Sequence, residues 1–326
     1  MRAWVVDRFG GPERLRLREW PEPVPGPDEV LVRVRAIGLN FADGAVRAGV
    51  YPKTPRPPFV PGLEVAGEVE GGGRVIAIPL FGGHAERVAV ASSRVFPIPD
   101  EASFEEAAAF GVAFLTADYA LREAGRVRPG ERVLVNAAMG GVGTAILQLA
   151  RSLRARVLAV ASTEGKRQGA LALGAEASAG YDDWPAVVRE KFGALDVVLD
   201  SVGGSFLRKA WRRLDRGGRY VLYGFASAFS RRGFSPLRAA REILSAGAVL
   251  PFTLLSSNRT LCGFNLSLAP GRVEALRLAA ARLEEMWRKG EIRPVLGVRL
   301  PFERLPEGHA ALTSRSTVGK IVVAVP

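Results

Sequence analysis

The first third of the chain alternates apolar and polar positions with a period of two, which is typical of β-strands. In the stretch EVLVRVRAIG, Val32 and Val34 fall on one face, and Arg33 and Arg35 mark the other. Residues 64–90 continue as short strand-like segments broken by Gly-rich turns. Such a pattern predicts a small closed or partly closed β-sheet.

After Phe110 the pattern changes to short, almost continuously apolar runs that are mostly separated by helical stretches. These runs are 133–137, 156–162, 195–202, 218–224 and 260–265. Apolar strands that alternate with helices predict a parallel sheet covered on both faces. Strand-like segments return near the C-terminus. We therefore expect an α/β protein that combines a doubly wound parallel sheet with a β-rich domain.

A small-residue loop follows the first of these runs and opens a helix. It reads Ala138-Met139-Gly140-Gly141-Val142-Gly143, which is the G-x-G-x-x-G pattern with Ala at the first glycine. Small residues allow the backbone to approach a pyrophosphate, and the helix N-terminus offers free N–H groups to it. The strand before and the helix after make a dinucleotide site the preferred interpretation, with a plain tight turn as the alternative.

The end of the second strand indicates which dinucleotide is bound. NAD-binding domains place an acidic residue roughly 20 residues after the loop, whereas this strand ends in Ala161 and Ser162. Ser162 offers a hydroxyl, and Lys166 and Arg167 can pair with a 2′-phosphate. NADPH is therefore favoured over NADH. Two alternatives stay open: Lys166 and Arg167 form only a solvated helix start, or Glu164 reaches back as the missing acid.

Composition narrows the class of protein. The 326 residues carry a formal net charge of +12, yet the basic residues are spread along the chain. This spread argues against nucleic acid as the main partner. No apolar run reaches the roughly 20 residues of a membrane span, and the N-terminus lacks the pattern of a secretory signal. The single cysteine, Cys262, excludes an internal disulfide, which fits a cytoplasmic protein.

The chain offers few ligands for zinc. A catalytic zinc site uses about three ligands from Cys, His or carboxylates, and the chain has one Cys and only two His, His84 and His309. We expect both histidines to be structural or surface residues, and no metal to be bound. Without a metal, the substrate should carry its own electron sink. Quinones and α,β-unsaturated carbonyls accept hydride directly and delocalise the resulting charge.

Seven motifs together resemble a known family, the zinc-independent quinone oxidoreductases of the zeta-crystallin type. These belong to the medium-chain dehydrogenase/reductase superfamily, and the chain is similar to the branch that includes the vesicle amine transport protein. The motifs are AIGLNFADGAVRAGVYP (36–52), PGLEVAG (61–67), GVAFLTADYAL (111–121), NAAMGGVGTAILQLAR (136–151), VVLDSVGG (197–204), NRTLCGFNL (258–266) and VGKIVV (318–323).

The resemblance implies a GroES-like catalytic domain made from the two ends of the chain, a Rossmann domain between them, and a dimer. We expect the catalytic domain to comprise 1–112 and 268–326, and the Rossmann domain 113–267. The implied substrate-side residues are Asn40, Asp43 and Tyr51. The implied cofactor residues, together with Ala138 and Arg167 from the analysis above, are Thr116, Gly140, Gly141, Val142, Gly143, Ser162, Lys166, Tyr181, Phe264, Asn265 and Lys320.

Several departures and alternatives remain at these positions. Zinc-binding relatives carry Gly-His-Glu where this chain has Gly62-Leu63-Glu64, and some quinone reductases carry Tyr where it has Ala45. Four of the implied residues also have a purely structural alternative. Asn40 could cap a helix, Asp43 could pair with an arginine, Tyr51 could pack in the core, and Lys320 could lie at the surface. The main alternative to an NADPH-dependent reductase is a cofactor-binding structural, lipid-binding or nucleic-acid-binding protein with little turnover.

Residues 228–257 are both strongly apolar and basic, with Phe229, Phe234, Arg231 and Arg232 near the start of the segment. We weigh three interpretations: an ordinary crossover helix with a core face, a mobile cap on a hydrophobic substrate channel, and a membrane-surface segment. The short apolar strand that follows is expected at a sheet edge, where an exposed apolar strand invites pairing with a second copy of the chain.

Overall fold

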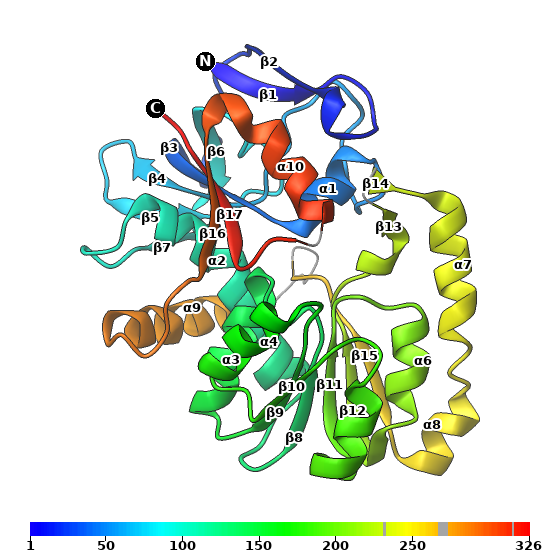
Figure 1. Ribbon diagram of the computed structural model, residues 1–326. Coiled ribbons are helices and arrows are strands. Elements are labelled where there is room, and N and C mark those ends of the chain that lie inside the picture. Colours follow the sequence, from blue (N-terminus) through cyan, green and yellow to red (C-terminus); the bar gives the residue numbers. More distant parts are fainter. Residues whose placement is uncertain (231–232, 267–272, 315) are drawn as a thin grey trace. The chain divides into compact units, whose positions relative to one another are not determined.

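The structure is a computed structural model that describes residues 1–230, 233–266, 273–314 and 316–326. The chain forms two units (Figure 1). Unit 1 comprises Met1–Leu115, Ser230–Phe234 and Gly271–Pro326, and unit 2 comprises Thr116–Phe229 and Ser235–Pro270. The first domain limit was expected at 112/113. The second expected limit, at 267/268, and the two arginines Arg231 and Arg232 lie outside the described residues. The domain limits therefore stay predictions.

Unit 1 is built on a seven-stranded sheet that joins the two ends of the chain. Its strands run in the order β16-β17-β3-β4-β5-β7, and β6 also pairs with β3. The C-terminal strand β17 lies antiparallel to β3, with Val323 opposite Ile37. The strands are β3 (Glu29–Leu39), β4 (Val65–Val69), β5 (Arg74–Ala77), β6 (Arg87–Ala91), β7 (Val95–Pro97), β16 (Leu296–Pro301) and β17 (Lys320–Ala324). The expected alternation is confirmed, because Val32 and Val34 are fully buried and Arg33 is exposed.

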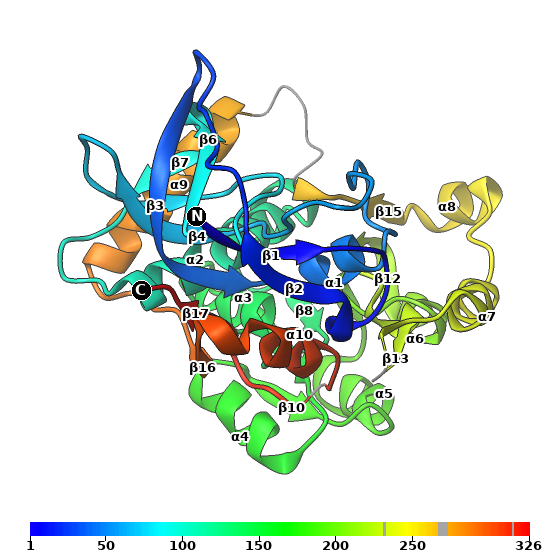
Figure 2. The ribbon, with the colours of Figure 1, turned by 90° about the horizontal axis from the view of Figure 1, so that it is seen from above.

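The other elements of unit 1 cover this sheet. The first two strands form a separate antiparallel pair, with Trp4 opposite Leu17, and Figure 2 shows them side by side. Phe110 stacks on Phe114 and on Trp287, each with ring centroids 4.3 Å apart. The elements are β1 (Arg2–Val6), η1 (Pro12–Arg14), β2 (Leu15–Glu19), α1 (Phe41–Arg47), η2 (Ser92–Arg94), α2 (Phe104–Asp118), α9 (Val273–Arg288), η7 (Phe302–Arg304) and α10 (Leu305–Ser314).

Unit 2 is a six-stranded parallel sheet in the order β10-β9-β8-β11-β12-β15. In chain order this is 3-2-1-4-5-6, the order of a dinucleotide-binding domain, so the expected fold class is confirmed. The strands are β8 (Arg132–Val135), β9 (Arg156–Val160), β10 (Ala177–Ala179), β11 (Leu195–Asp200), β12 (Leu214–Leu222) and β15 (Thr260–Gly263). The sequence analysis missed β10, because three small residues carry little strand signal.

Helices cover both faces of this sheet, and Figure 1 shows α3 and α4 on one side and α6 on the other. The core between sheet and helices includes Leu134, Trp184 and Tyr220, all fully buried. The helical elements are η3 (Tyr119–Ala124), α3 (Gly141–Ser152), α4 (Glu164–Ala172), α5 (Trp184–Val187), η4 (Val188–Phe192) and α6 (Ser205–Trp211).

The segment 228–257 begins at the last residue of η5 (Ala226–Ala228) and contains β13 (Phe229–Ser230), β14 (Gly233–Phe234), α7 (Pro236–Ala246) and α8 (Pro251–Ser257). The crossover-helix interpretation holds only in part. Val249 and Leu254 pack partly against the core, but Leu237 is 83% exposed and Phe252 76%. Within the described residues no single helix has the length and apolar character of a membrane span, although α7 and α8, bent by 43°, meet that test as a pair.

Candidate active site

The N-terminus of α1 is organised by Asn40 and Asp43. Asn40 has an extended backbone (φ −114°, ψ 151°) and precedes the first helical residue. Its backbone N–H donates to Asp43 Oδ2 at 2.7 Å, and the Asp43 N–H donates to the Asn40 carbonyl at 2.9 Å. Asn followed three residues later by an acidic residue is a helix-start signal. Asn40 therefore occupies the N-cap position of α1, as the helix-cap interpretation expects, but the hydrogen bonds at this position come from its backbone and from the Asp43 carboxylate.

The side chain of Asn40 also belongs to a buried polar network. Its Nδ2 donates to Glu64 Oε2 at 2.9 Å and to the Gly38 carbonyl at 3.2 Å. Its Oδ1 accepts from Lys320 Nζ at 2.7 Å. Both amide hydrogens and one of the two oxygen lone pairs are thus engaged. The amide is fixed in orientation and, in this arrangement, can serve a further group only as an acceptor.

Lys320 and Glu64 form a buried ion pair within this network. The distance from Lys320 Nζ to Glu64 Oε2 is 2.7 Å, and the two side chains are 5% and 0% exposed. The surface interpretation of Lys320 is therefore wrong. The sequence analysis did not single out Glu64 as a functional residue. The sequence signal for Glu64 was that this chain keeps the glutamate of the Gly-His-Glu pattern in Gly62-Leu63-Glu64. The partners of Glu64 are 24 and 256 residues away in sequence, so the signal could not reveal them.

A second buried group lies around Asp43. The side chains of Asp43, His84 and His309 are fully buried, and His84 Nε2 lies 3.8 Å from Asp43 Oδ1. The two imidazole rings are in edge contact with centroids 5.1 Å apart. Arg47, 1% exposed, donates from Nε to the Gly10 carbonyl at 3.1 Å. Both histidines are therefore interior residues of unit 1, not surface residues.

Burial decides the charges in this group. It raises the pKa of Asp43 to about 7, opposed by the Asn40 N–H and by the charge of Lys320. Burial, together with the charge of Arg47, lowers the pKa of His84 to about 3. Burial also holds the pKa of His309 well below its ordinary value. Both imidazoles are thus neutral near pH 7, and Asp43 titrates in the neutral range. The expected arginine partner of Asp43 makes no ion pair with it among the described residues.

Tyr51 lies in the loop that follows α1. It is half-buried and packs against the core of unit 1, as its packing interpretation expects. Its carbonyl accepts from the Thr54 hydroxyl at 2.6 Å. The structure gives no direct support to a catalytic role for Tyr51, which stays a prediction.

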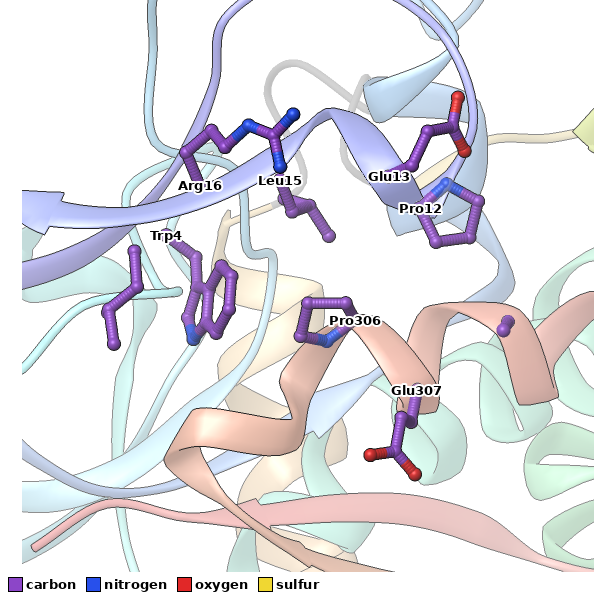
Figure 3. Close-up of a pocket in the computed structure, with 9 residues that line it drawn as sticks. Trp4, Pro12, Glu13, Leu15, Arg16, Pro306 and Glu307 are labelled. Carbon is purple, nitrogen blue, oxygen red and sulfur yellow. The ribbon is translucent and has the colours of Figure 1, made fainter.

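A pocket in unit 1 lies away from all of these residues. Trp4, Leu15 and Arg16 line it from β1 and β2, and Pro306 and Glu307 line it from α10 (Figure 3). Figure 3 shows the Trp4 and Pro306 rings among its lining side chains, with the Glu13 and Glu307 carboxyl groups farther along it. None of the residues expected at the active site lines this pocket.

In unit 2 the Gly-rich loop has the geometry that a dinucleotide loop requires. Gly140 precedes α3 with φ −79° and ψ 173°. A Cβ at Gly143 would lie 2.5 Å from the Ala137 carbonyl oxygen, so only glycine fits there. Ala137 itself has a positive φ of 47°, a conformation uncommon for residues other than glycine. Its N–H donates to the Tyr181 hydroxyl at 3.1 Å, so Tyr181 supports the start of the loop.

The residues expected at a 2′-phosphate gather after β9. Ser162 is exposed and Lys166 half-buried, and partial burial lowers the pKa of Lys166. Arg167 pairs with Glu164 at 2.7 Å, and the other oxygen of Glu164 accepts from Gln168 at 2.6 Å. The alternative in which Glu164 reaches back as a ribose-binding acid is not what the structure shows, because its carboxylate faces its own helix.

A second network, which the sequence analysis missed, lies at the carboxyl ends of β8 and β11. Asp200 is fully buried, and it accepts from Asn136 Nδ2, from the Tyr220 hydroxyl and from the backbone N–H groups of Val202 and Gly203. Asn136 Oδ1 accepts from the Ser201 N–H at 3.0 Å. These two strands flank the switch point of the sheet, where doubly wound folds bind ligands. The signal was the polar residues that directly follow two apolar strands.

Comparison with known proteins identifies the family. Residues 26–77 match the family described as "Alcohol dehydrogenase GroES-like domain", and residues 141–276 match "Zinc-binding dehydrogenase". The chain is 32% identical to the mouse (Mus musculus) synaptic vesicle membrane protein VAT-1 homolog, over 99% of this chain and 83% of that protein. It is also 32% identical to the quinone oxidoreductase of Lama guanicoe, over 99% of this chain and 97% of the relative. The chain belongs to the medium-chain dehydrogenase/reductase superfamily.

A solved structure agrees with this placement in the superfamily. The quinone oxidoreductase of Thermus thermophilus, solved alone and with NADPH, superposes with a TM-score of 0.85. It is 42% identical, and the superposition covers 99% of this chain and 100% of that one. The expected resemblance to the quinone oxidoreductase and VAT-1 branches of the superfamily is therefore confirmed.

Three further residues, Thr116, Phe264 and Asn265, were expected to contact the cofactor. Thr116 is half-buried in α2. Phe264 follows β15 and contacts Tyr119 and Tyr223, with ring centroids 4.7 and 6.0 Å away. Asn265 is half-buried beside it. The three stay predictions as cofactor residues.

One of the two matched family descriptions, "Zinc-binding dehydrogenase", mentions zinc. Across the described ranges of this chain, no group of three or more His, Cys, Asp or Glu side chains is arranged to hold a metal ion. Cys262 lies in β15 of unit 2 and is half-buried.

Proposed function

We propose that the protein is an NADPH-dependent, metal-independent reductase that transfers hydride to quinones or α,β-unsaturated carbonyls. The observation that carries this proposal is the Gly-rich loop of unit 2. It follows a central strand, opens α3 and admits no side chain at Gly143. The kinship with quinone oxidoreductases, one of them solved with NADPH, supports the same conclusion.

The loop and its surroundings fit a dinucleotide. Gly140, Gly141, Val142 and Gly143 would hold the pyrophosphate through N–H groups at the start of α3, where the helix dipole favours an anion. Ala138 would line the approach to the loop. Ser162, Lys166 and Arg167, with Tyr181 supporting the loop, would hold the 2′-phosphate. Thr116, Phe264 and Asn265 complete the proposed cofactor set. When bound, NADPH supplies the hydride.

We assign Asn40, Asp43 and Lys320 to the substrate side. A carbonyl that accepts hydride develops negative charge on its oxygen, and fixed donors or cations stabilise that charge. Lys320 brings a buried ammonium to this group, and two of its three N–H groups hold Glu64 and Asn40. Lys320 was expected beside the cofactor, but these contacts favour a role with Asn40. Asp43, fully buried, holds the Asn40 backbone and does not face solvent.

We also propose that the protein is a homodimer joined through β15. In the described part of the sheet, β15 pairs only with β12, so its other edge is available. Unit 2 also carries exposed apolar residues, including Leu244 (81%) in α7, Leu255 (74%) in α8 and Leu261 (39%) in β15 itself. Sedimentation at micromolar concentration is expected to give a dimer. A monomer across that range would contradict this part of the proposal.

The central experiment measures NADPH oxidation by the purified protein with a panel of quinones, enones and enals, with and without a metal chelator. We expect turnover with at least one class of acceptor, unchanged by chelation. Gly140→Val serves as the matched control. A Cβ at Gly140 meets only the Ala137 oxygen at 3.3 Å, so the variant should fold while its side chain blocks the pyrophosphate.

The outcomes separate the competing functions. NADPH binding without turnover of any acceptor would favour a cofactor-binding structural protein. Loss of activity with chelator, together with stoichiometric zinc, would exclude the metal-independent mechanism. Unchanged NADPH affinity in Gly140→Val would show that the loop is only a turn.

A further inference from the structure

We propose that Glu64 is the positioning residue of the substrate-side group: its carboxylate fixes Asn40, Lys320 and the backbone of α2 relative to one another. This inference rests on the proposed function for the consequence in catalysis. The geometry on which it stands lies wholly within unit 1.

The carboxylate of Glu64 joins three segments that are far apart in sequence. Oε2 accepts from Asn40 Nδ2 at 2.9 Å and from Lys320 Nζ at 2.7 Å. Oε1 accepts from the backbone N–H of Val112 at 2.7 Å. The start of α1, the first residue of β17 and the middle of α2 therefore share one buried anion. Val112 lies about one helical turn before Thr116 in α2.

Two glycines leave the space that this carboxylate occupies. A Cβ at Gly38 would lie 2.9 Å from Glu64 Oε2 and 1.8 Å from the Ala108 carbonyl oxygen. A Cβ at Gly111 would lie 3.0 Å from Oε1 and 2.6 Å from Ile76 Cγ2. Neither glycine has a positive φ, so close approach, not backbone conformation, explains glycine at both positions. The sequence thus makes room for Glu64 on two sides.

Glu64 controls the orientation of the Asn40 amide. An amide can rotate by half a turn and exchange its oxygen and nitrogen, and only its partners decide which way it points. Glu64 accepts from the nitrogen, and Lys320 donates to the oxygen. Lys320 is held by Glu64 in turn. Without the carboxylate, both the Asn40 amide and the Lys320 ammonium lose the acceptor that sets their positions.

Charge balance provides a rival explanation that an experiment must separate from positioning. Removing one partner of a buried ion pair leaves the other charge uncompensated and destabilises the fold. A loss of activity in Glu64→Gln alone would fit either explanation. The double variant Glu64→Gln/Lys320→Met has no such unpaired charge, but it still lacks the Glu64 carboxylate. Because it also lacks Lys320, which we assign to the substrate side, it is compared with Glu64→Gln by thermal stability and amide exchange rather than by kcat.

The experiment compares wild type, Glu64→Gln, the double variant and a matched control, all in the full-length protein. The control is Glu68→Gln in β4, four residues away, whose ion pair with Arg35 at 2.9 Å is partly exposed to solvent. The readouts are kcat and KM with a quinone, NADPH affinity by fluorescence titration, and thermal stability. Amide exchange by NMR at Val112 and at the Asn40 side chain reports the hydrogen bonds directly.

In Glu64→Gln we expect kcat to fall at least tenfold and NADPH affinity to stay within twofold. Exchange at Val112 and at the Asn40 amide should become at least tenfold faster. The double variant should recover thermal stability but keep the accelerated exchange at Val112, and Glu68→Gln should match wild type in kcat and KM. Unchanged kcat in Glu64→Gln, or wild-type exchange at Val112 in the double variant, would overturn the proposal.

The exchange data also separate this proposal from the proposed function. If the wild type fails to oxidise NADPH with every acceptor of the panel, the proposed function fails. Amide exchange then tests the positioning role of Glu64 independently of activity. Accelerated exchange at both amides would support positioning. Unchanged exchange would refute it.

Discussion

Each unit buries a carboxylate within a hydrogen-bond network at its candidate site, Glu64 in unit 1 and Asp200 in unit 2, and the two are compensated differently. Glu64 in unit 1 faces the ammonium of Lys320 at 2.7 Å. Asp200 in unit 2 has only neutral donors: an amide, a phenol and two backbone N–H groups. Removing a single counter-charge leaves the buried carboxylate with no opposite charge and costs its whole stabilisation at once. Removing one of four neutral donors leaves the other three hydrogen bonds in place, so the loss of stability is smaller. Unit 1 should therefore be the more sensitive to single substitutions.

The pKa directions fit this contrast. Burial raises the pKa of Asp200, opposed by its hydrogen bonds to Tyr220, Gly203, Asn136 and Val202. Burial and the nearby charge of Asp200 raise the pKa of Tyr220, so its hydroxyl stays a donor. Neutral donors fix the loops at the ends of β8 and β11 without adding charge beside the proposed cofactor crevice. In unit 1, by contrast, the positive charge is placed where we expect a developing negative charge.

The largest effect is expected from Lys320→Met, which leaves Glu64 buried without a counter-ion. Removing one partner of a buried pair typically costs about 3–5 kcal/mol, and urea unfolding measures the change. Adding Glu64→Gln to the same chain should recover more than half of that loss. A single variant within about 1 kcal/mol of wild type would show that the pair contributes little, and the contrast between the units would fail.

The next effect depends on pH and concerns Asp43. Its pKa is about 7 in the fold and 3.8 as the ordinary value. Between these values the folded state holds a proton that the unfolded state has released, so the wild type loses stability as pH rises from about 4 to about 7. Asp43→Asn removes this dependence. Relative to wild type, the variant should therefore gain roughly 2.5 kcal/mol between pH 5 and pH 8.

Urea unfolding of both proteins at the two pH values measures this gain. Asp7→Asn provides a control, because Asp7 is a partly exposed carboxylate that pairs with Arg18. It should show no comparable gain. An equal stability difference between Asp43→Asn and wild type at both pH values would contradict the raised pKa.

A smaller effect is expected in unit 2 from Tyr220→Phe. The substitution removes one of four donors to Asp200 and leaves the aromatic ring in the core. The expected loss is about 1–2 kcal/mol in the free energy of unfolding. NADPH affinity should also weaken modestly, since Asp200 holds the backbone after β11. A loss as large as that of Lys320→Met would mean that neutral donors are no more tolerant than a counter-ion.

Local and long-range features differed in how well the sequence predicted them. The loop 138–143 and most strands of unit 2 were predictable, because their signals lie within a few consecutive residues. The short strand β10 lacked such a signal. The sequence did not single out Glu64, Asn136 and Asp200 as functional residues, because their hydrogen-bond partners lie as much as 256 residues away. Lys320 was singled out by resemblance alone, and only the fold revealed that it faces Asn40 and Glu64.

The smallest effect on stability should come from Lys166→Ala, which tests the proposed 2′-phosphate site of unit 2. Lys166 is half-buried after β9, and a charge-assisted contact to phosphate is typically worth about 1.5–3 kcal/mol. NADPH should therefore show a KM about tenfold higher, while the KM for NADH stays nearly unchanged.

Arg167→Ala should have a weaker effect, because Glu164 already engages its guanidinium. Unlike Lys320→Met, neither variant should lower the free energy of unfolding by more than about 0.5 kcal/mol, as is usual for surface substitutions. Equal increases in KM for NADPH and NADH would assign Lys166 to the fold of α4 and remove it from the proposed 2′-phosphate site.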